Sequence, residues 1–305
     1  MIIQFPGENI LIQHKFTDIA DDWSKETFPQ LAYGTLRSYT AGLKNAKLYF
    51  NDKNIENITH QDINSYFTDY LVAKRNLGKN TVKNYRNVIS GIFKYAVLKD
   101  IIPANPVKDV TIPKGLKTTP RPLPPDSDIE KVKANINSEF GLFYYIALFT
   151  GLRRGEILAL RYEDFDFKNN LIKVDKSIYY KHNKPYVKKP KTEAGIRYTP
   201  FLEQLKSRIP KNMEGALFAD EYGNYLTESQ LKVKLNRYKR ETKVVGTPHQ
   251  IRHEFATHLY QANIPDKDIS TILGHSDVST SKNIYIHITK QQLSKSTEIL
   301  NKYFS

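Results

Sequence analysis

The stretch TPHQIRHEFATHL, residues 247–259, brings together side chains that could do chemistry. It holds three of the eight histidines of the chain, with one arginine and one glutamate. The zinc-protease motif H-E-x-x-H needs two histidines one helical turn apart, so that both face the same ion. After His253 and Glu254, however, Thr257 occupies the second ligand position and His258 comes one residue late. At 3.6 residues per turn this offset rotates the His258 ring by roughly 140°, which disfavours a metal site.

His249 and Arg252 are three residues apart, which places their side chains next to each other on a helix. A guanidinium can donate to two phosphate oxygens while an imidazole binds a third or moves a proton. Thr247 predicts an N-cap, Pro248 suits the first helical position, and Gln250 completes a capping box. His249 would then lie where exposed N–H groups and the helix dipole favour an anion over an imidazolium. We therefore hypothesise a neutral His249 that can accept a proton.

Such a pair alone is common on solvated helix faces, and its further partners come from three other motifs. TGLRRGEILAL offers Arg153 after a glycine turn and Glu156 three residues later. KKPKTEAGIRY offers Lys191 in an expected hairpin, and ILGHSDVSTSKNIYIH offers His275 after a glycine and Tyr285 ten residues on. In isolation each would be a surface charge, a helix-end contact or a core tyrosine. Together they indicate phosphate chemistry.

In these motifs the chain resembles the tyrosine recombinase (phage integrase) family. The family pattern is an arginine in T-G-[LM]-R-x-x-E, a hairpin lysine, H-x-x-R, L-G-H and a nucleophilic tyrosine, and every part is present in this order. The segments GKNTVKNYRNVISGIFKYAV and NPV also look like the core-binding domain of the family. The resemblance covers roughly residues 16–300, and it implies a DNA strand transferase.

The resemblance also implies a role for each residue. Arg153 and Arg252 would clamp the non-bridging phosphate oxygens while Tyr285 attacks, with His249 as base and Lys191 as acid. His275 would bind a phosphate oxygen, and Glu156 would hold the arginine or a histidine. The residues that contact DNA would be Arg154, Lys188, Lys189, Lys83 and Arg86. The phosphotyrosyl bond keeps the bond energy, so no cofactor, ATP or metal is expected. The two other histidines of the first stretch, His253 and His258, are expected to pack or to bond a carbonyl.

Composition fits a folded, DNA-directed protein. The 305 residues are 40% apolar, enough for two domains, and the absence of cysteine excludes disulfides, thiol nucleophiles and cysteine-ligated zinc. No signal peptide and no apolar run of about 18 residues is present, which predicts a cytoplasmic protein without a membrane partner. Residues 114–305 hold 32 basic and 21 acidic side chains, a net charge of +11 out of +14. A polyanion partner explains such clustering, with plain solubility as the alternative, and the resemblance implies that this partner is double-stranded DNA.

Apolar periodicity predicts a mainly α fold with a small antiparallel β-sheet. Helices are expected over residues 16–100, with candidate caps at Thr35, Thr59 and Asn80, and again after a capping box at Ser127 and Glu130. FGLFYYIALFTGLRRGEILAL reads as two buried helices broken at a glycine. A sheet is expected from about residue 171 to 198, and helices thereafter.

Seven prolines within residues 101–125 mark a linker, and with it the domain order. We expect a short N-terminal extension at 1–15, a helical core-binding (SAM-like) domain at 16–110, the linker at 111–125, and an α+β catalytic domain with a C-terminal tail at 126–305. The short extension argues against a separate arm-binding domain.

The resemblance further implies partners. The two domains would clamp duplex DNA from opposite faces, with a monomer or weak oligomer when free, a homotetramer on two sites, and an accessory directionality factor. The tail, residues 291–305, would be exchanged between protomers or dock on its own domain. A mobile-element integrase is favoured over an Xer-like chromosome-dimer resolvase or a DNA invertase. A type IB topoisomerase and a non-catalytic DNA-binding regulator are more distant alternatives, and a metallonuclease lacks its carboxylate cluster.

Overall fold

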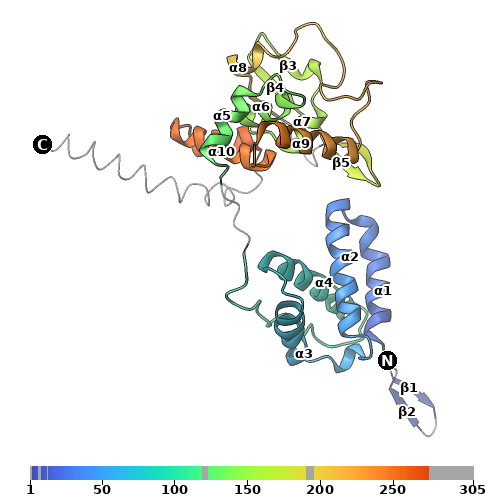
Figure 1. Ribbon diagram of the computed structural model, residues 1–305. Helices are drawn as coiled ribbons and strands as arrows, with labels where there is room; N and C mark the ends of the chain where they lie inside the picture. The colour runs from blue at the N-terminus through green and yellow to red at the C-terminus, as the bar shows by residue number, and fades with distance from the viewer. Residues whose placement is uncertain (1, 6–7, 12, 119–122, 190–195, 275–305) are drawn as a thin grey trace, which may run out of the picture. The chain divides into compact units, whose positions relative to one another are not determined.

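The computed structural model describes residues 2–5, 8–11, 13–118, 123–189 and 196–274 (Figure 1). Three residues expected in the active site, Lys191, His275 and Tyr285, therefore lie outside the described residues, as does the tail 291–305. The chain divides into two compact units, residues 1–120 and 121–305. Each is mainly helical, and the strands are short and antiparallel, as the sequence predicts. In the described part of the chain no helix is long and apolar enough to cross a membrane.

The first unit is a bundle in which α1 and α2 both pack on α4. Its elements are the hairpin β1 (Ile2–Phe5) and β2 (Glu8–Leu11), α1 (Phe16–Thr27), α2 (Tyr33–Tyr49), α3 (His60–Ser65), the π-helix η3 (Tyr66–Lys74), α4 (Lys79–Leu98), and the short 3-10 turns Phe28–Gln30 and Ile55–Asn57. The predicted apolar stripe of α4 is buried at Val82, Tyr85, Ile89 and Phe93. The hairpin within residues 1–15 was not predicted from the sequence.

The predicted helix starts in this unit are right at one position and wrong at two. Thr59 caps α3, because its side chain accepts from the N–H of Asp62 in a complete capping box. The prediction of Thr35 is wrong, since α2 begins two residues earlier. Asn80 is also wrong: α4 begins at Lys79, whose N–H donates to the carbonyl of Lys117 at 3.0 Å. A backbone carbonyl from later in the chain thus replaces the side-chain cap.

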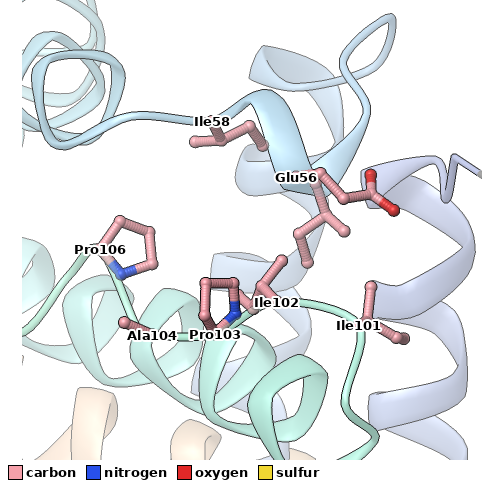
Figure 2. Close-up of a pocket in the computed structure, with 8 residues that line it drawn as sticks. Glu56, Ile58, Ile101, Ile102, Pro103, Ala104 and Pro106 are labelled. Atoms are coloured by element: carbon pink, nitrogen blue, oxygen red, sulfur yellow. The ribbon is translucent and has the colours of Figure 1, made fainter. Parts of the chain in front are cut away.

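A small pocket in this unit is lined by the isoleucines, prolines and alanine of residues 55–58 and 101–106 (Figure 2). Its one charged lining group, the carboxylate of Glu56, accepts from the backbone N–H of His14 at 3.0 Å and contacts its Nδ1 at 2.6 Å. Ligand sites usually combine an apolar wall with a few free polar groups. The pocket offers no uncommitted charge, so we assign it no ligand.

The second unit places its helices around two small sheets. The helices are α5 (Asp126–Ala134), α6 (Gly141–Thr150), α7 (Arg154–Ala159), α8 (Glu203–Lys206), α9 (Glu228–Thr242), α10 (Pro248–Gln261) and α11 (Asp266–Leu273). One sheet has the order β3 (Phe165–Asp166), β4 (Leu171–Val174), β7 (Arg197–Pro200), and the other is the hairpin β5 (Ser177–Lys181) and β6 (Lys184–Lys188). The single sheet expected between residues 171 and 198 is therefore split in two.

Gly151 breaks the two buried helices as predicted. It ends α6 with φ +60°, and a Cβ there would lie 2.4 Å from Cδ1 of Phe255, on the α10 helix that packs against α6. The capping box at Ser127 and Glu130 is wrong, because α5 begins at Asp126, behind Pro125, and has no side-chain cap. The reason lies at Asp128, the residue after Ser127, because its buried carboxylate accepts from the backbone N–H groups of Val245 and Gly246 just before α10.

Candidate active site

The N-terminus of α10 has the predicted form. Thr247 and Gln250 complete a reciprocal capping box, with Pro248 as the first helical residue. His249 is exposed in this first turn, whereas Arg252 is buried. The cap thus fixes the turn that carries both side chains, and it leaves the imidazole at the helix end where an anion is favoured.

The buried carboxylate of Glu156 organises three arginines of the unit. It accepts from the backbone N–H of Arg153 at 2.7 Å and from its Nη1 at 2.9 Å. Arg197 binds both carboxylate oxygens in a fork, at 3.0 and 2.8 Å, and Nη1 of Arg252 lies 3.8 Å away. Three guanidiniums, from the N-cap of α7, from β7 and from α10, therefore surround one carboxylate.

The same three guanidiniums also hold the end of α11. Arg197, Arg252 and Arg153 donate in turn to the successive carbonyls of residues 272–274, at 3.1, 2.8 and 2.5 Å. The last carbonyls of a helix lack intrahelical partners and form its negative pole. The arginines satisfy these carbonyls, and they fix the backbone one residue before His275.

The charges of this cluster do not balance. Burial alone would raise the pKa of the Glu156 carboxyl, but hydrogen bonds and charge from Arg197 and Arg153 outweigh it and lower the pKa to about 2. Burial lowers the pKa of Arg252 to about 9, and the positive charge of Arg153 adds to this effect. Nη1 of Arg252 is buried and makes no hydrogen bond within the described residues. Three guanidiniums and one carboxylate leave the cluster with a net positive charge, which favours the binding of an anion.

Two histidines meet at the start of α10. Nε2 of His249 lies 3.1 Å from Nε2 of His253, and the rings are edge to face with centroids 4.5 Å apart. A hydrogen bond between these atoms requires at least one of them to be unprotonated. From the sequence we expected His253 to pack or to bond a carbonyl, and no sequence pattern indicated its contact with His249. His258, given the same assignment, lies 3.3 Å from Glu254.

The expected DNA contacts have different surroundings. Four of them are exposed: Arg154 at the start of α7, Lys188 at the end of β6, Lys189 directly after it, and Lys83 on α4. Arg86 is half-buried, and its guanidinium donates to the carbonyls of residues 107 and 110 at 3.2 Å, which ties α4 to the segment before the linker. A DNA contact by Arg86 stays a prediction.

The residue that the sequence analysis missed is Arg197. In the sequence it stands in KKPKTEAGIRY, the motif that was considered only for Lys191, although its side chain is just 7% exposed. Strand alternation carries the missed signal, since Arg197 and Thr199 are buried in β7 while Tyr198 between them is exposed. An arginine on the inward parity of a strand requires a buried acidic partner.

Comparison with known proteins places these features in context. Residues 129–292 match the phage integrase family, and residues 15–112 match the phage integrase SAM-like domain. A tyrosine recombinase XerC-like protein of Caldanaerobacter subterraneus subsp. tengcongensis is 29% identical over 310 residues, covering 89% of this chain and 76% of that protein. The transposase from transposon Tn916 of Enterococcus faecalis is 26% identical over 257 residues, covering 73% of this chain and 62% of that protein. The Tn1549 transposon integrase in complex with transposon right end DNA shares the fold, with a TM-score of 0.78, 21% identity and coverage of 94% of this chain and 99% of that chain.

Proposed function

The chain belongs to the phage integrase family, and from this premise we propose that it is a site-specific tyrosine recombinase that cuts and rejoins duplex DNA. The single observation that carries the proposal furthest is the buried cluster around Glu156. It presents an excess of guanidinium charge and, among the residues that the structure describes, an N–H of Arg252 without a hydrogen-bond partner beside the end of α11. A scissile phosphate supplies the missing negative charge.

The reaction follows from these groups. The phenol oxygen of Tyr285 attacks phosphorus, the bond from phosphorus to the 5′ oxygen breaks, and a 3′-phosphotyrosyl bond forms. His249 takes the phenol proton, and Lys191 gives a proton to the departing 5′ oxygen. Arg153 and Arg252 stabilise the charge on the non-bridging oxygens. Attack by the 5′-hydroxyl of another strand reverses the step, so strand exchange needs neither ATP nor a metal.

Positioning of these groups is the role we propose for the remaining residues. Glu156 orients Arg153 through two hydrogen bonds, and His275 binds a phosphate oxygen directly after the fixed end of α11. Exposed Arg154, Lys188 and Lys83 approach the DNA backbone.

We propose a mobile-element integrase as the subtype, because the relatives include the Tn916 transposase and the fold matches the Tn1549 transposon integrase. An Xer-like resolvase is the second candidate, favoured by the XerC-like relative. The partners we propose are double-stranded DNA, three further copies of the chain on paired sites, and an accessory directionality factor, all in the cytoplasm. Two plasmid assays separate the subtypes. An integrase should join two plasmids that each carry a site into one larger circle, whereas a resolvase should split a plasmid dimer into two smaller circles, and the product sizes tell the two reactions apart.

A suicide-substrate assay tests the activity. A duplex is first selected from a random-sequence pool by its binding to Tyr285→Phe protein, and nicked copies of it are then incubated with unaltered protein in EDTA. We expect a protein–DNA adduct that resists denaturation with the unaltered protein and none with Tyr285→Phe. An adduct that survives this substitution, or cleavage that needs magnesium, contradicts the proposal.

Deleting residues 291–305 tests the proposed exchange of the tail between protomers. The tail carries the apolar residues Leu293, Ile299, Leu300, Tyr303 and Phe304. We expect the truncated protein to bind a single site with unchanged affinity and to lose cooperativity on paired sites, as measured by gel shift. Cooperativity equal to that of the full chain would show that the tail is not exchanged.

A further inference from the structure

We propose that Arg197 is a positioning residue for the recombination reaction, which fixes three separate segments of the active site relative to one another. The inference rests on the proposed function, and it concerns a residue outside the set of reacting groups. Its guanidinium joins the start of β7, the carboxylate of Glu156 and the end of α11. Each of these segments leads directly to a proposed reacting group.

All three guanidinium nitrogens of Arg197 already donate a hydrogen bond within the protein. Nη1 and Nη2 donate to the two oxygens of Glu156, and Nε donates to the carbonyl of Ile272 at 3.1 Å. The side chain is 7% exposed. A planar fork matched to a carboxylate fixes both distance and orientation, which a lysine cannot do. Within the described residues Nη1 of Arg252 makes no hydrogen bond, whereas every nitrogen of Arg197 makes one, so we assign Arg197 to supporting the phosphate clamp and not to the clamp itself.

Contact with Gly274 adds a steric constraint. This glycine has φ +62°, and a Cβ at its position would lie 2.7 Å from Cζ of Arg197. The guanidinium thus packs directly against the backbone that precedes His275. The glycine of the L-G-H motif is needed both for its left-handed conformation and for this close approach.

Two of the proposed reacting groups are linked to Arg197, Arg153 through the contact with Glu156 and Lys191 through its position in the sequence. Glu156 passes the constraint to Arg153, which it binds through main chain and side chain. Lys191 precedes Arg197, the first residue of β7, by six positions in the sequence. Strand β7 is also held two residues after Arg197, where the hydroxyl of Thr199 donates to the carbonyl of Thr150 at 3.3 Å. Movement of Arg197 would thus displace acid, clamp and phosphate-binding histidine together.

The test compares Arg197→Lys with Arg208→Lys in single-turnover cleavage of the selected nicked duplex. Arg208 is an exposed arginine of the same unit, so its variant loses the same chemistry without the buried fork. We expect Arg197→Lys to lower the cleavage rate constant at saturating DNA by about 100-fold, as for a misplacement of about 1 Å. Its Kd for the duplex should stay that of the unaltered protein, and Arg208→Lys should match the unaltered protein in both.

Amplitude and rate constant separate positioning from stability. Partial unfolding lowers the amplitude of adduct formation without changing the rate constant of the folded fraction, whereas misplacement lowers the rate constant at full amplitude. If Arg197→Lys does not fold, Gly274→Ala provides the second variant, because it displaces the guanidinium without removing a charge. An unchanged rate constant in the folded variant overturns the inference. Failure of the proposed function is a different result, namely no adduct with the unaltered protein.

Discussion

Glu156 carries one negative charge among three guanidiniums, and the balance of these charges governs the site at the scale of single residues. Two of the guanidiniums, on Arg153 and Arg252, belong to the proposed phosphate clamp. They need positive charge to work, yet Arg252 is buried beside Arg197, and burying like charges together costs free energy. The carboxylate limits this cost without neutralising the site, so the cluster keeps the excess positive charge that the proposed function requires for a phosphate.

Replacing Glu156 by glutamine tests this balance through stability. The folded-state pKa of the carboxyl is about 2, below its usual value of 4.5, so the charged group stabilises the fold above pH 4.5 and the effect disappears as pH falls through 2. Glu156→Gln should lower the free energy of unfolding by about 3 kcal/mol at neutral pH. Urea titrations of both proteins at several pH values should show the difference shrinking between pH 4.5 and 2.

Glu130→Gln is the matched control for this prediction. Glu130 also pairs with a cation three residues away, Lys133 at 2.8 Å, but its side chain is 75% exposed. An exposed pair of this kind contributes at most about 1 kcal/mol. Equal losses for the two glutamine variants, or a Glu156→Gln loss that does not change with pH, would argue against a buried charge network.

At the scale of elements, local sequence predicted helix starts only where the side chains themselves complete the cap. Thr59 and Thr247 each have an acceptor side chain three residues later, and both cap their helices in the structure. Asn80 fails because a distant carbonyl, that of Lys117, binds the first amide of α4. Ser127 fails because the buried carboxylate of Asp128 fixes α5 by binding the loop before α10.

The same limit explains what was missed in the candidate site. The family motifs and the spacing of Arg153, Glu156, His249 and Arg252 were readable along the chain, and the family matches confirm the resemblance drawn from them. Arg197 lies 41 residues from its partner Glu156, and no local pattern links the two. Pairings across such a separation are decided by how β7, α7 and α11 pack, and this packing is not written in any single segment.

Removing the cap of α10 tests the link between helix start and chemistry. Thr247→Ala should lower stability by about 1 kcal/mol, seen as a fall in Tm of about 2–4 °C. Because His249 lies in the uncapped turn, the rate of adduct formation should fall as well, on the order of tenfold. Differential scanning calorimetry and the nicked-duplex assay measure the two effects.

Thr227→Ala provides the comparison, since Thr227 forms the equivalent capping box with Gln230 at the start of α9. It should cost a similar amount of stability and leave the rate of adduct formation unchanged. Equal rate losses in the two alanine variants would mean that the α10 cap acts only through global stability.

At the scale of the whole molecule, the hydrophobic cores of the two units share no residue among those that the structure describes, and the second unit adds a smaller apolar cluster that includes Phe255, Tyr260 and Leu273. In the described part of the chain, the first core ends with Val110 and the second begins with Ile129. The stretch between them contains the proline-rich segment, and its Ile112 and Leu116 pack, partly buried, against the first core. Each unit therefore has the means to fold by itself, and the connection between them matters for binding more than for folding.

Cutting the connection tests this division in the full-length protein. A protease site inserted between residues 120 and 121 allows cleavage after folding, so that the cut and uncut samples contain the same residues. Two units that fold independently should each keep a cooperative unfolding transition after cleavage. If both units bind one duplex, loss of the link should weaken binding by about 100- to 10,000-fold, because the second contact is no longer intramolecular. Calorimetry and gel shift against the selected duplex measure both effects, with uncut protein plus inactivated protease as control.

Loss of either transition on cleavage would place stabilising contacts across the cut, and an affinity equal to that of the uncut protein would assign DNA binding to one unit alone.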